Sequence, residues 1–195
     1  MRRIVVSEFL TLDGVMEAPG RETSLGKRGG WVLKFSDEEL RKHRRDQLFA
    51  SDALLLGRVT YQIFAAAWPT MTDQTGFAAR MNSIPKYVVS STLNALEWNN
   101  SRLINGNIRE EVSKLKQQPG KDILAVGSGE LVATLMQHDL IDELCLTLVP
   151  VVLGKGKRLF QGASDLKFLK LRDMNTLSSG IAILTYQTSG NDVKK

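Results

Sequence analysis

The feature that most constrains this chain is an apolar run that breaks on glycines and passes at once into a helical pattern. Ile123–Val126 is apolar, Gly127–Gly129 interrupts it, and Leu131, Val132 and Leu135 then share one helical face. A strand that turns through glycines into a helix leaves backbone N–H groups free, and the helix dipole adds positive character there. Such a turn suits a phosphate group, but a tight turn also needs glycine for steric reasons alone. The pattern predicts a strand–turn–helix unit and leaves both explanations of its glycines open.

Composition is typical of an ordinary globular domain. The chain has 195 residues, of which 43% are hydrophobic and 24% are charged, which is enough for one domain with its own core. No apolar run approaches the ~20 residues of a membrane helix, and the N-terminus lacks the apolar segment of a signal peptide. Cys145 is the one cysteine and lies in an apolar strand pattern, so we expect a buried, unreactive thiol. We therefore expect a cytoplasmic protein that does not bind membranes.

The formal net charge of +5 is compatible with an anionic ligand but does not require one. Much of the excess lies in residues 41–45, within one expected helix, and such a run is usually a solvated helix face. No basic strand with interleaved aromatic residues is present, so a nucleic-acid binder is the weakest interpretation. His43 and His138 stand apart, and we expect no metal site.

Strand patterns alternate with helix patterns as far as about residue 150. Strands are expected at 3–9, 53–56, 86–90, 102–106, 123–126, 143–153, 168–173 and 181–186, and helices at 37–50, 58–68, 76–81, 107–118 and 129–136. Alternation of this kind predicts an α/β fold with a mainly parallel sheet, and the last strands, which lack helices between them, predict an antiparallel edge. We expect one domain over residues 1–188 and a flexible polar tail over residues 189–195.

Three of the expected strand–helix turns carry groups that suit phosphate. They are Leu56–Thr60, Val89–Thr92 and Val126–Glu130. In an open parallel sheet these turns lie at the carboxyl ends of the strands, where ligands bind. A guanidinium, hydroxyl groups and two glycine turns together favour a phosphorylated cofactor, and Arg58 with Ser90 favours NADPH over NADH. Arg58 as a surface charge and Ser90 as a turn cap are the simpler alternatives.

In this order the motifs resemble the dihydrofolate reductase-like superfamily, in particular its riboflavin-biosynthesis reductases, the group that includes the C-terminal domain of the deaminase-reductase. The motifs are Ser7 with Thr11–Gly14, Leu54–Tyr61, Tyr87–Thr92, Gly127–Leu131, and Asp142–Leu144 with Pro150–Gly154. The resemblance covers about residues 2–188 and implies a three-layer fold. It also implies hydride transfer from NADPH to a C=N or C=O group of a small heterocycle or sugar derivative.

The resemblance further implies site residues. The cofactor would be held by Gly57, Arg58, Thr60, Ser90, Ser91, Thr92, Gly127, Ser128, Gly129, Glu130 and Leu131, with Leu12 and Gly14 in a lid beside the nicotinamide. Asp13 would be the polar group nearest the reaction centre. An Asp–Gly turn explains Asp13 at least as well.

The first helix departs from the dihydrofolate reductase pattern. Those enzymes carry an acidic residue, which protonates the pterin, about sixteen residues before the position of Gly57, and here that residue is Arg41. Glu38, Glu39 or Asp46 could replace it only from another helical register. Dihydrofolate is therefore not expected to be a good substrate.

The inward stripe of the same helix, which contains Leu40 and Leu48, also contains His43 and Arg44. These two side chains either line a substrate pocket or extend to solvent. If they line the pocket, their positive character favours a small substrate that is anionic or carbonyl-bearing.

A second departure concerns the glycine turn. Riboflavin-type reductases carry a carboxylate just before it, and this chain has Ala125 and Val126 there. The missing carboxylates leave open a second hypothesis, a non-catalytic NADPH-binding or regulatory protein. Finally, the long apolar strand expected at 143–153 lies near the sheet edge, so it must be covered or paired, and we expect a homodimer.

Overall fold

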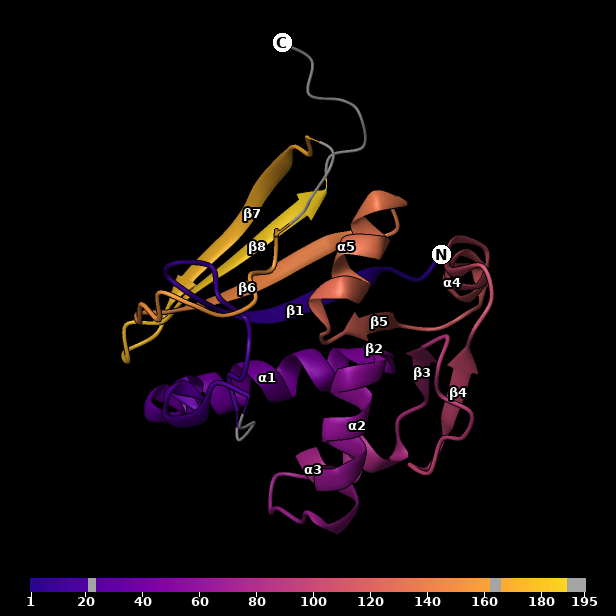
Figure 1. Ribbon diagram of the computed structural model, residues 1–195, viewed down its shortest axis with the longest axis horizontal. Helices are drawn as coiled ribbons and strands as arrows, with labels where there is room; N and C mark the ends of the chain where they lie inside the picture. Colours follow the sequence, from indigo (N-terminus) through magenta and orange to yellow (C-terminus); the bar gives the residue numbers. More distant parts are fainter. Residues whose placement is uncertain (21–23, 162–165, 189–195) are drawn as a thin grey trace.

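One eight-stranded sheet runs through the molecule in the order β4-β3-β2-β5-β1-β6-β8-β7 (Figure 1). The computed structural model describes residues 1–20, 24–161 and 166–188. The strands are β1 (Ile4–Thr11), β2 (Ser51–Gly57), β3 (Lys86–Val89), β4 (Ser101–Ile104), β5 (Asp122–Ala125), β6 (Glu143–Val149), β7 (Leu169–Thr176) and β8 (Ala182–Thr188). The α-helices are α1 (Glu38–Ala50), α2 (Arg58–Ala67), α3 (Phe77–Ser83), α4 (Ile108–Gln117) and α5 (Gly129–Gln137). The expected tail at 189–195 lies outside the described residues.

The sheet is parallel from β4 to β6. β8 pairs antiparallel with β6, and β7 pairs antiparallel with β8. The predicted fold class, a mainly parallel sheet with an antiparallel C-terminal edge, is confirmed.

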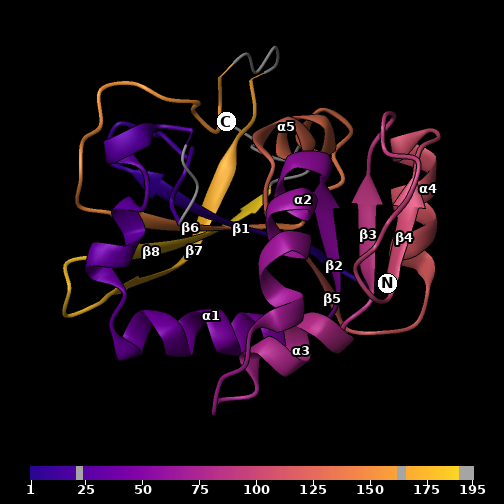
Figure 2. The same cartoon turned by 60° about the horizontal axis from the view of Figure 1, so that its bottom comes forward.

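Helices cover both faces of the sheet and make three layers. α1, α2 and α3 lie on one side and α5 lies on the other, as Figures 1 and 2 show. Ile123 of β5 packs in one apolar cluster with Leu135 of α5. Leu56 of β2 packs in a second cluster with Tyr61 of α2 and Met81 of α3. Burial of these apolar stripes against both faces supplies the main driving force for the fold.

The amino ends of two helices show how side chains set local structure. Asn107 caps α4 and accepts a hydrogen bond from the Glu110 N–H at 3.3 Å. Ser36 and Glu39 have the sequence spacing of a capping box before α1, but Asp37 is the cap and accepts from the Leu40 N–H at 2.8 Å. Glu39, which would close the box, instead accepts from the Ser178 N–H.

β6 corrects one expectation. The strand ends at Val149, and not at Leu153, because Pro150 has no N–H to donate to a neighbouring strand. It also lies inside the sheet, between β1 and β8, so its backbone is paired on both sides, and most of its side chains are buried. The edge strands are β4 and β7, and the expectation that residues 143–153 lie near the edge was wrong.

Candidate functional site

The three turns meet at the carboxyl ends of neighbouring strands, as the sequence predicted, but only those after β2 and β5 lead into helices. The turn after β3 continues as a loop to β4, so the expected strand–helix turn there was wrong. β3, β2 and β5 are parallel neighbours, so their carboxyl ends and the turns that follow lie side by side. Gly57 pairs in register with Val89, the last residue before Ser90. The Gly57 N–H donates to the Gly127 carbonyl at 3.3 Å, which joins the first turn directly to the third.

Close approach between these turns explains why Gly57 has no side chain. A Cβ atom at Gly57 would lie 2.5 Å from Ser128 Oγ and 3.1 Å from the Ser128 backbone nitrogen. The Ser128 hydroxyl would have to move, and the backbone distance is tighter than most real Cβ contacts, so a larger residue at this position would require the Ser128 turn to shift. A Cβ atom at Gly127 would likewise meet the hydroxyl of Thr60, on the first turn of α2. Gly57, Thr60, Gly127 and Ser128 therefore form one compact surface.

The amino end of α5 is open toward this surface. Ser128 occupies the N-cap position but its side chain caps no backbone group. The first N–H groups of the helix, those of Gly129 and Glu130, have no acceptor within the part of the chain that the structure describes. Glu130 is exposed, whereas Leu131 is buried in the core, so the Leu131 side chain supports the fold and does not reach a ligand.

The second turn shows Ser90 acting as a local cap. Its Oγ accepts from the N–H groups of Thr92 at 3.1 Å and Leu93 at 3.0 Å. Ser91 and Thr92 are exposed, so their hydroxyl groups can reach a ligand. Arg58 is also exposed, and its guanidinium bonds to Gln62 at 3.2 Å, one helical turn away on α2. A ligand phosphate could replace that single contact.

The loop after β1 is held by Asp13. Its carboxylate accepts from the Thr11 hydroxyl at 2.7 Å and from the N–H groups of Leu153 and Gly154 at 3.1 and 2.9 Å. These hydrogen bonds, that from Thr11 first, lower the pKa of Asp13 to about 2. A carboxylate with these contacts suits the Asp–Gly turn interpretation and is a poor proton donor. Its assignment to catalysis stays a prediction that the contacts do not favour.

The same loop reaches the glycine turn through Met16. A Cβ atom at Gly129 would lie 2.7 Å from Met16 Sδ. The loop that carries exposed Leu12 and half-buried Gly14 is therefore next to the amino end of α5. This placement agrees with the expected position of a lid, whose movement stays a prediction.

The inward face of α1 carries polar side chains, as the stripe predicted. Gln47 accepts from the Ser7 hydroxyl of β1 at 2.9 Å. His43 Nε2 lies 3.6 Å from Cys145 Sγ, and burial lowers the pKa of His43 and raises the pKa of Cys145 to about 11. Cys145 is therefore a buried, unreactive thiol.

Arg44 lies between two aromatic rings. Its guanidinium carbon is 5.4 Å from the ring centre of Phe9 on β1 and 5.5 Å from that of Phe77 on α3. Burial lowers its pKa, and within the described ranges its side chain has neither a carboxylate partner nor a hydrogen bond. A half-buried cation in this state is suited to receive an anionic group.

The carboxylates of α1 point elsewhere. Glu38 pairs with Arg41, and Asp46 pairs with Lys42, both on the exposed side of the helix. Glu39 bonds to the turn between β7 and β8 through Ser178. The register leaves no acid on the inner face, as the sequence indicated.

The sequence analysis missed Glu8, a buried carboxyl group on the central strand. Glu8 is 7% exposed, and its Oε1 accepts from the Gly127 N–H at 2.7 Å. Burial raises its pKa to about 8, against a smaller effect of the hydrogen bond. An acid on the face of β1 that also carries Ile4, Val6 and Leu10 interrupts an apolar alternation, and this interruption was the available indication.

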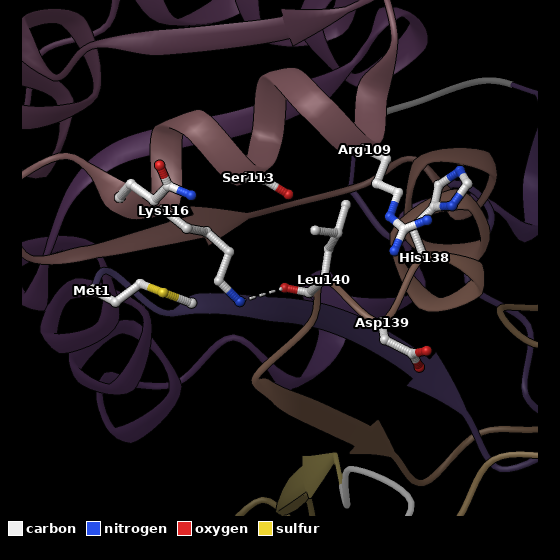
Figure 3. Close-up of a pocket in the computed structure, with 8 residues that line it drawn as sticks. Met1, Arg109, Ser113, Lys116, His138, Asp139 and Leu140 are labelled. Atoms are coloured by element: carbon white, nitrogen blue, oxygen red, sulfur yellow. Dashed lines mark hydrogen bonds between the residues drawn. The ribbon is translucent and has the colours of Figure 1, made fainter.

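A separate pocket of about 350 Å³ lies between α4 and the turn after α5 (Figure 3). Its polar lining includes Arg109, Lys116 and His138, and Lys116 is bonded to the Leu140 carbonyl and to Asp142. None of the predicted site residues lines it. In the described part of the chain there is also no cluster of three or more residues able to hold a metal ion, and no helix able to cross a membrane.

Comparison with known proteins places the chain in a family. Residues 2–184 match the family of the RibD C-terminal domain. This chain belongs to that family. YyaP of Bacillus subtilis strain 168, itself uncharacterized, is 34% identical over 192 residues, which cover 97% of this chain and 96% of YyaP. The resemblance to riboflavin-biosynthesis reductases is thereby confirmed.

Solved structures of the RibD family and its relatives share the fold. A protein from Shewanella sp. PV-4, provisionally assigned to riboflavin biosynthesis, has a TM-score of 0.71 at 19% identity over 96% of this chain and 99% of that protein. The deaminase/5-amino-6-(5-phosphoribosylamino)uracil reductase of Thermotoga maritima has a TM-score of 0.65 at 14% identity, and the match spans 96% of this chain and 57% of that enzyme. At these identities the likeness shows the fold alone.

Proposed function

We propose that this protein is an NADPH-dependent reductase that passes hydride to a C=N or C=O group of a small heterocycle or sugar derivative. The observation that carries the proposal is the contact of the Gly57 and Ser128 turns beside the open amino end of α5. That arrangement offers unpaired N–H donors and the positive end of a helix dipole, the features that bind a diphosphate. Membership of the RibD reductase-domain family supports the same activity.

Each of the turns at the carboxyl ends of β2, β3 and β5, and the loop after β1, suits one part of NADPH. The amino end of α5 would hold the diphosphate. Exposed Arg58, with the hydroxyl groups of Ser91 and Thr92 on the neighbouring turn, would hold the 2′-phosphate. The loop at Leu12–Gly14 would lie against the nicotinamide, which supplies the hydride when bound. The chain's own contribution is to orient donor and acceptor and to exclude water.

The face of α1 supports a substrate that carries an anionic group. Arg44 has two aromatic neighbours and no carboxylate partner among the described side chains. An anion bound there would compensate the half-buried charge, and the rings of Phe9 and Phe77 would stack with a planar heterocycle.

A non-catalytic NADPH-binding protein is the second candidate. It is favoured by the inner face of α1, which carries no carboxylate, and by the low pKa of Asp13. Neither feature affects cofactor binding, so the two candidates differ in turnover alone.

Oxidation of NADPH in the presence of a substrate panel tests the proposal. The panel pairs carboxylated or phosphorylated heterocycles and carbonyl compounds with their uncharged analogues and includes dihydrofolate. The proposal predicts turnover of at least one anionic member, with dihydrofolate orders of magnitude below the ~10⁴–10⁸ M⁻¹s⁻¹ of ordinary enzymes in kcat/KM. NADPH binding without turnover of any member would favour the non-catalytic candidate, and absence of NADPH binding would contradict both.

A further inference from the structure

Glu8 lies in the centre of the sheet with apolar residues around it. It shares its face of β1 with Val6 and Leu10, and Leu146 of β6 stands opposite it in register. Only 7% of its surface is exposed. Burial of a carboxyl group in such surroundings costs free energy unless hydrogen bonds or a charge partner compensate, and residues that break the local pattern in this way are expected at functional sites.

The glycine turn supplies its one hydrogen bond within the described part of the chain. The Gly127 N–H donates to Glu8 Oε1 at 2.7 Å, while the Gly127 carbonyl accepts from Gly57. Both polar groups of Gly127 are therefore occupied from inside the protein. The donors left for a ligand are those that follow, on Ser128, Gly129 and Glu130.

Among the described residues, no cation lies beside Glu8 to stabilise a negative charge. Its pKa is raised to about 8 by burial, opposed by the Gly127 hydrogen bond, and no charged side chain contributes. Near neutral pH the group is a neutral acid, so it can support a turn that binds a diphosphate without repelling it.

We propose that Glu8 is a positioning residue of the NADPH site, which holds the Gly127–Ser128 turn through the Gly127 N–H, and that the turn binds the diphosphate best while Glu8 is the neutral acid, because an ionised carboxylate beneath the turn would repel the diphosphate. The inference rests on the proposed function. The inference goes beyond the proposed function because it makes cofactor affinity depend on the protonation of Glu8, a carboxyl group beneath the turn. No sequence motif assigned this role to Glu8.

Thermodynamic linkage between NADPH binding and protonation of Glu8 sets the expected pH dependence of the affinity. A diphosphate above the turn disfavours ionisation of Glu8 and so raises its pKa further in the complex. If that increase is about one unit, NADPH affinity falls about tenfold as the pH rises through both values. The window lies above the second pKa of a phosphate monoester, about 6, so the 2′-phosphate keeps its charge throughout.

Other ionisable groups face the turn or titrate in the same window. Asp13 and Glu17 lie in the loop after β1, Arg58 is the first residue of α2 and Glu130 is the second residue of α5. Lys86, at the start of β3, has its pKa lowered to about 8 by burial. The variant Glu8→Gln distinguishes the titration of Glu8 from that of these other groups. It keeps the oxygen that accepts from Gly127, mimics the neutral acid and leaves every other ionisable group in place.

The experiment is calorimetric titration of the wild type and of Glu8→Gln with NADPH at about pH 7 and about pH 9.5, on either side of the Glu8 pKa. The wild type should bind about tenfold more weakly at the higher pH, and Glu8→Gln less than about twofold more weakly. Glu38→Gln, which removes an exposed carboxylate on the outer side of α1 and outside the cofactor site, serves as the control and should keep the wild-type ratio.

Two results would count against the inference, and they are distinguishable. Wild-type binding with the same pH dependence in Glu8→Gln, or with none in either protein, would overturn the role of Glu8 and leave the NADPH site standing. No NADPH binding by the wild type at about pH 7 would instead overturn the proposed function itself. Circular dichroism of Glu8→Gln at both pH values checks that the variant is folded.

Discussion

Glu8 puts an acid where its neighbours on the same face of β1 are apolar, and this has a measurable cost in stability. The folded protein raises its pKa from 4.5 to about 8 through burial. Between these values the native state holds a proton that the unfolded state has lost. The free energy of unfolding therefore falls as the pH rises through this range, by roughly 1.4 kcal/mol for each unit at most.

Glu8→Gln should remove this dependence. Its unfolding free energy, measured with urea, should exceed that of the wild type by an amount that grows between about pH 5 and pH 8 and then levels off. A constant difference across that range would show that Glu8 is ionised in the folded protein.

The pKa of Asp13 is shifted in the opposite direction to that of Glu8, so its effect on the pH dependence of stability has the opposite sign. Its pKa is lowered from 3.8 to about 2, first by the Thr11 hydroxyl and then by the N–H groups of Leu153 and Gly154. The stability it contributes is present above its unfolded pKa and is lost as the pH falls toward about 2. Asp13→Asn should therefore be less stable than the wild type at pH 7, and the two should converge on acidification. Unfolding curves that stay equally far apart in acid would refute this assignment.

The roles of single residues were the hardest feature to predict from the sequence. Asp13 carried two interpretations because an Asp–Gly pair is typical of a turn wherever it occurs, and only the contacts with Leu153 and Gly154 separate them. Glu8 went unnoticed because one polar residue hardly changes the pattern of an apolar strand. Its partner, Gly127, is far away in sequence, and pairing of that kind depends on strand order.

Among the helices and strands, α1 gives the clearest indication of the class of substrate. Its inner face carries His43 and Arg44 and no acid. Dihydrofolate should therefore be reduced poorly, and Glu38→Ala, Glu39→Ala and Asp46→Ala should not change its turnover. Efficient reduction that any one of these variants abolishes would show that α1 supplies a proton donor after all.

The variant Arg44→Ala tests whether the inner face of α1 binds an anionic substrate. It should weaken binding of an anionic substrate by about tenfold or more, since a charge-assisted hydrogen bond is worth about 1.5–3 kcal/mol. Uncharged analogues should be affected much less. Lys42→Ala, on the exposed side of α1, is the matched control. Equal losses for charged and uncharged analogues would indicate that Arg44 acts through packing.

The elements themselves were largely predictable. The three turns could be expected to meet because the alternation of strands and helices predicts parallel neighbours, and the structure confirms β3-β2-β5. Exact ends were less predictable. Asp37, and not Ser36, caps α1, and Glu39 accepts from Ser178 on the β7–β8 turn, a contact between distant segments that the local pattern does not predict.

For the whole molecule, the described sheet ends in β4 on one side and in β7 on the other, and β7 is the edge that carries large exposed apolar side chains. The irregular pairing between Leu171 and Asp173 places Leu171 opposite Tyr186 and Met174 opposite Leu184, on one face of the sheet. Leu171 is 46% and Met174 is 62% exposed. Apolar side chains on an open strand are a site of association between chains. The expected homodimer remains our prediction, with β7 in place of β6 as its contact.

Light scattering at micromolar concentration tests this assembly. The wild type should be a dimer, and the double change Leu171→Lys with Met174→Lys should make it a monomer. Lys170→Ala, on the same strand, should remain dimeric. A monomeric wild type would mean that the β7 edge is left open in solution.

Strand order was not predictable from the chain alone. A long apolar strand such as β6 has the same pattern whether it lies at the edge or inside the sheet. Its position is decided by β8, which is joined to β7 by a hairpin and pairs along β6 from Glu143 to Leu148. Local sequence says little about such long-range pairing.

The central claim is that the edge formed by the three turns binds NADPH, and the most direct test is calorimetric titration with NADPH and NADH. NADPH should bind one per chain and at least ~10-fold more tightly than NADH, because Arg58 offers a charge-assisted contact to the 2′-phosphate. Arg58→Ala should erase most of this preference, while Arg109→Ala, an exposed arginine in the first turn of α4, should keep it. Equal affinity of the wild type for the two cofactors, or no binding of either, would contradict the account.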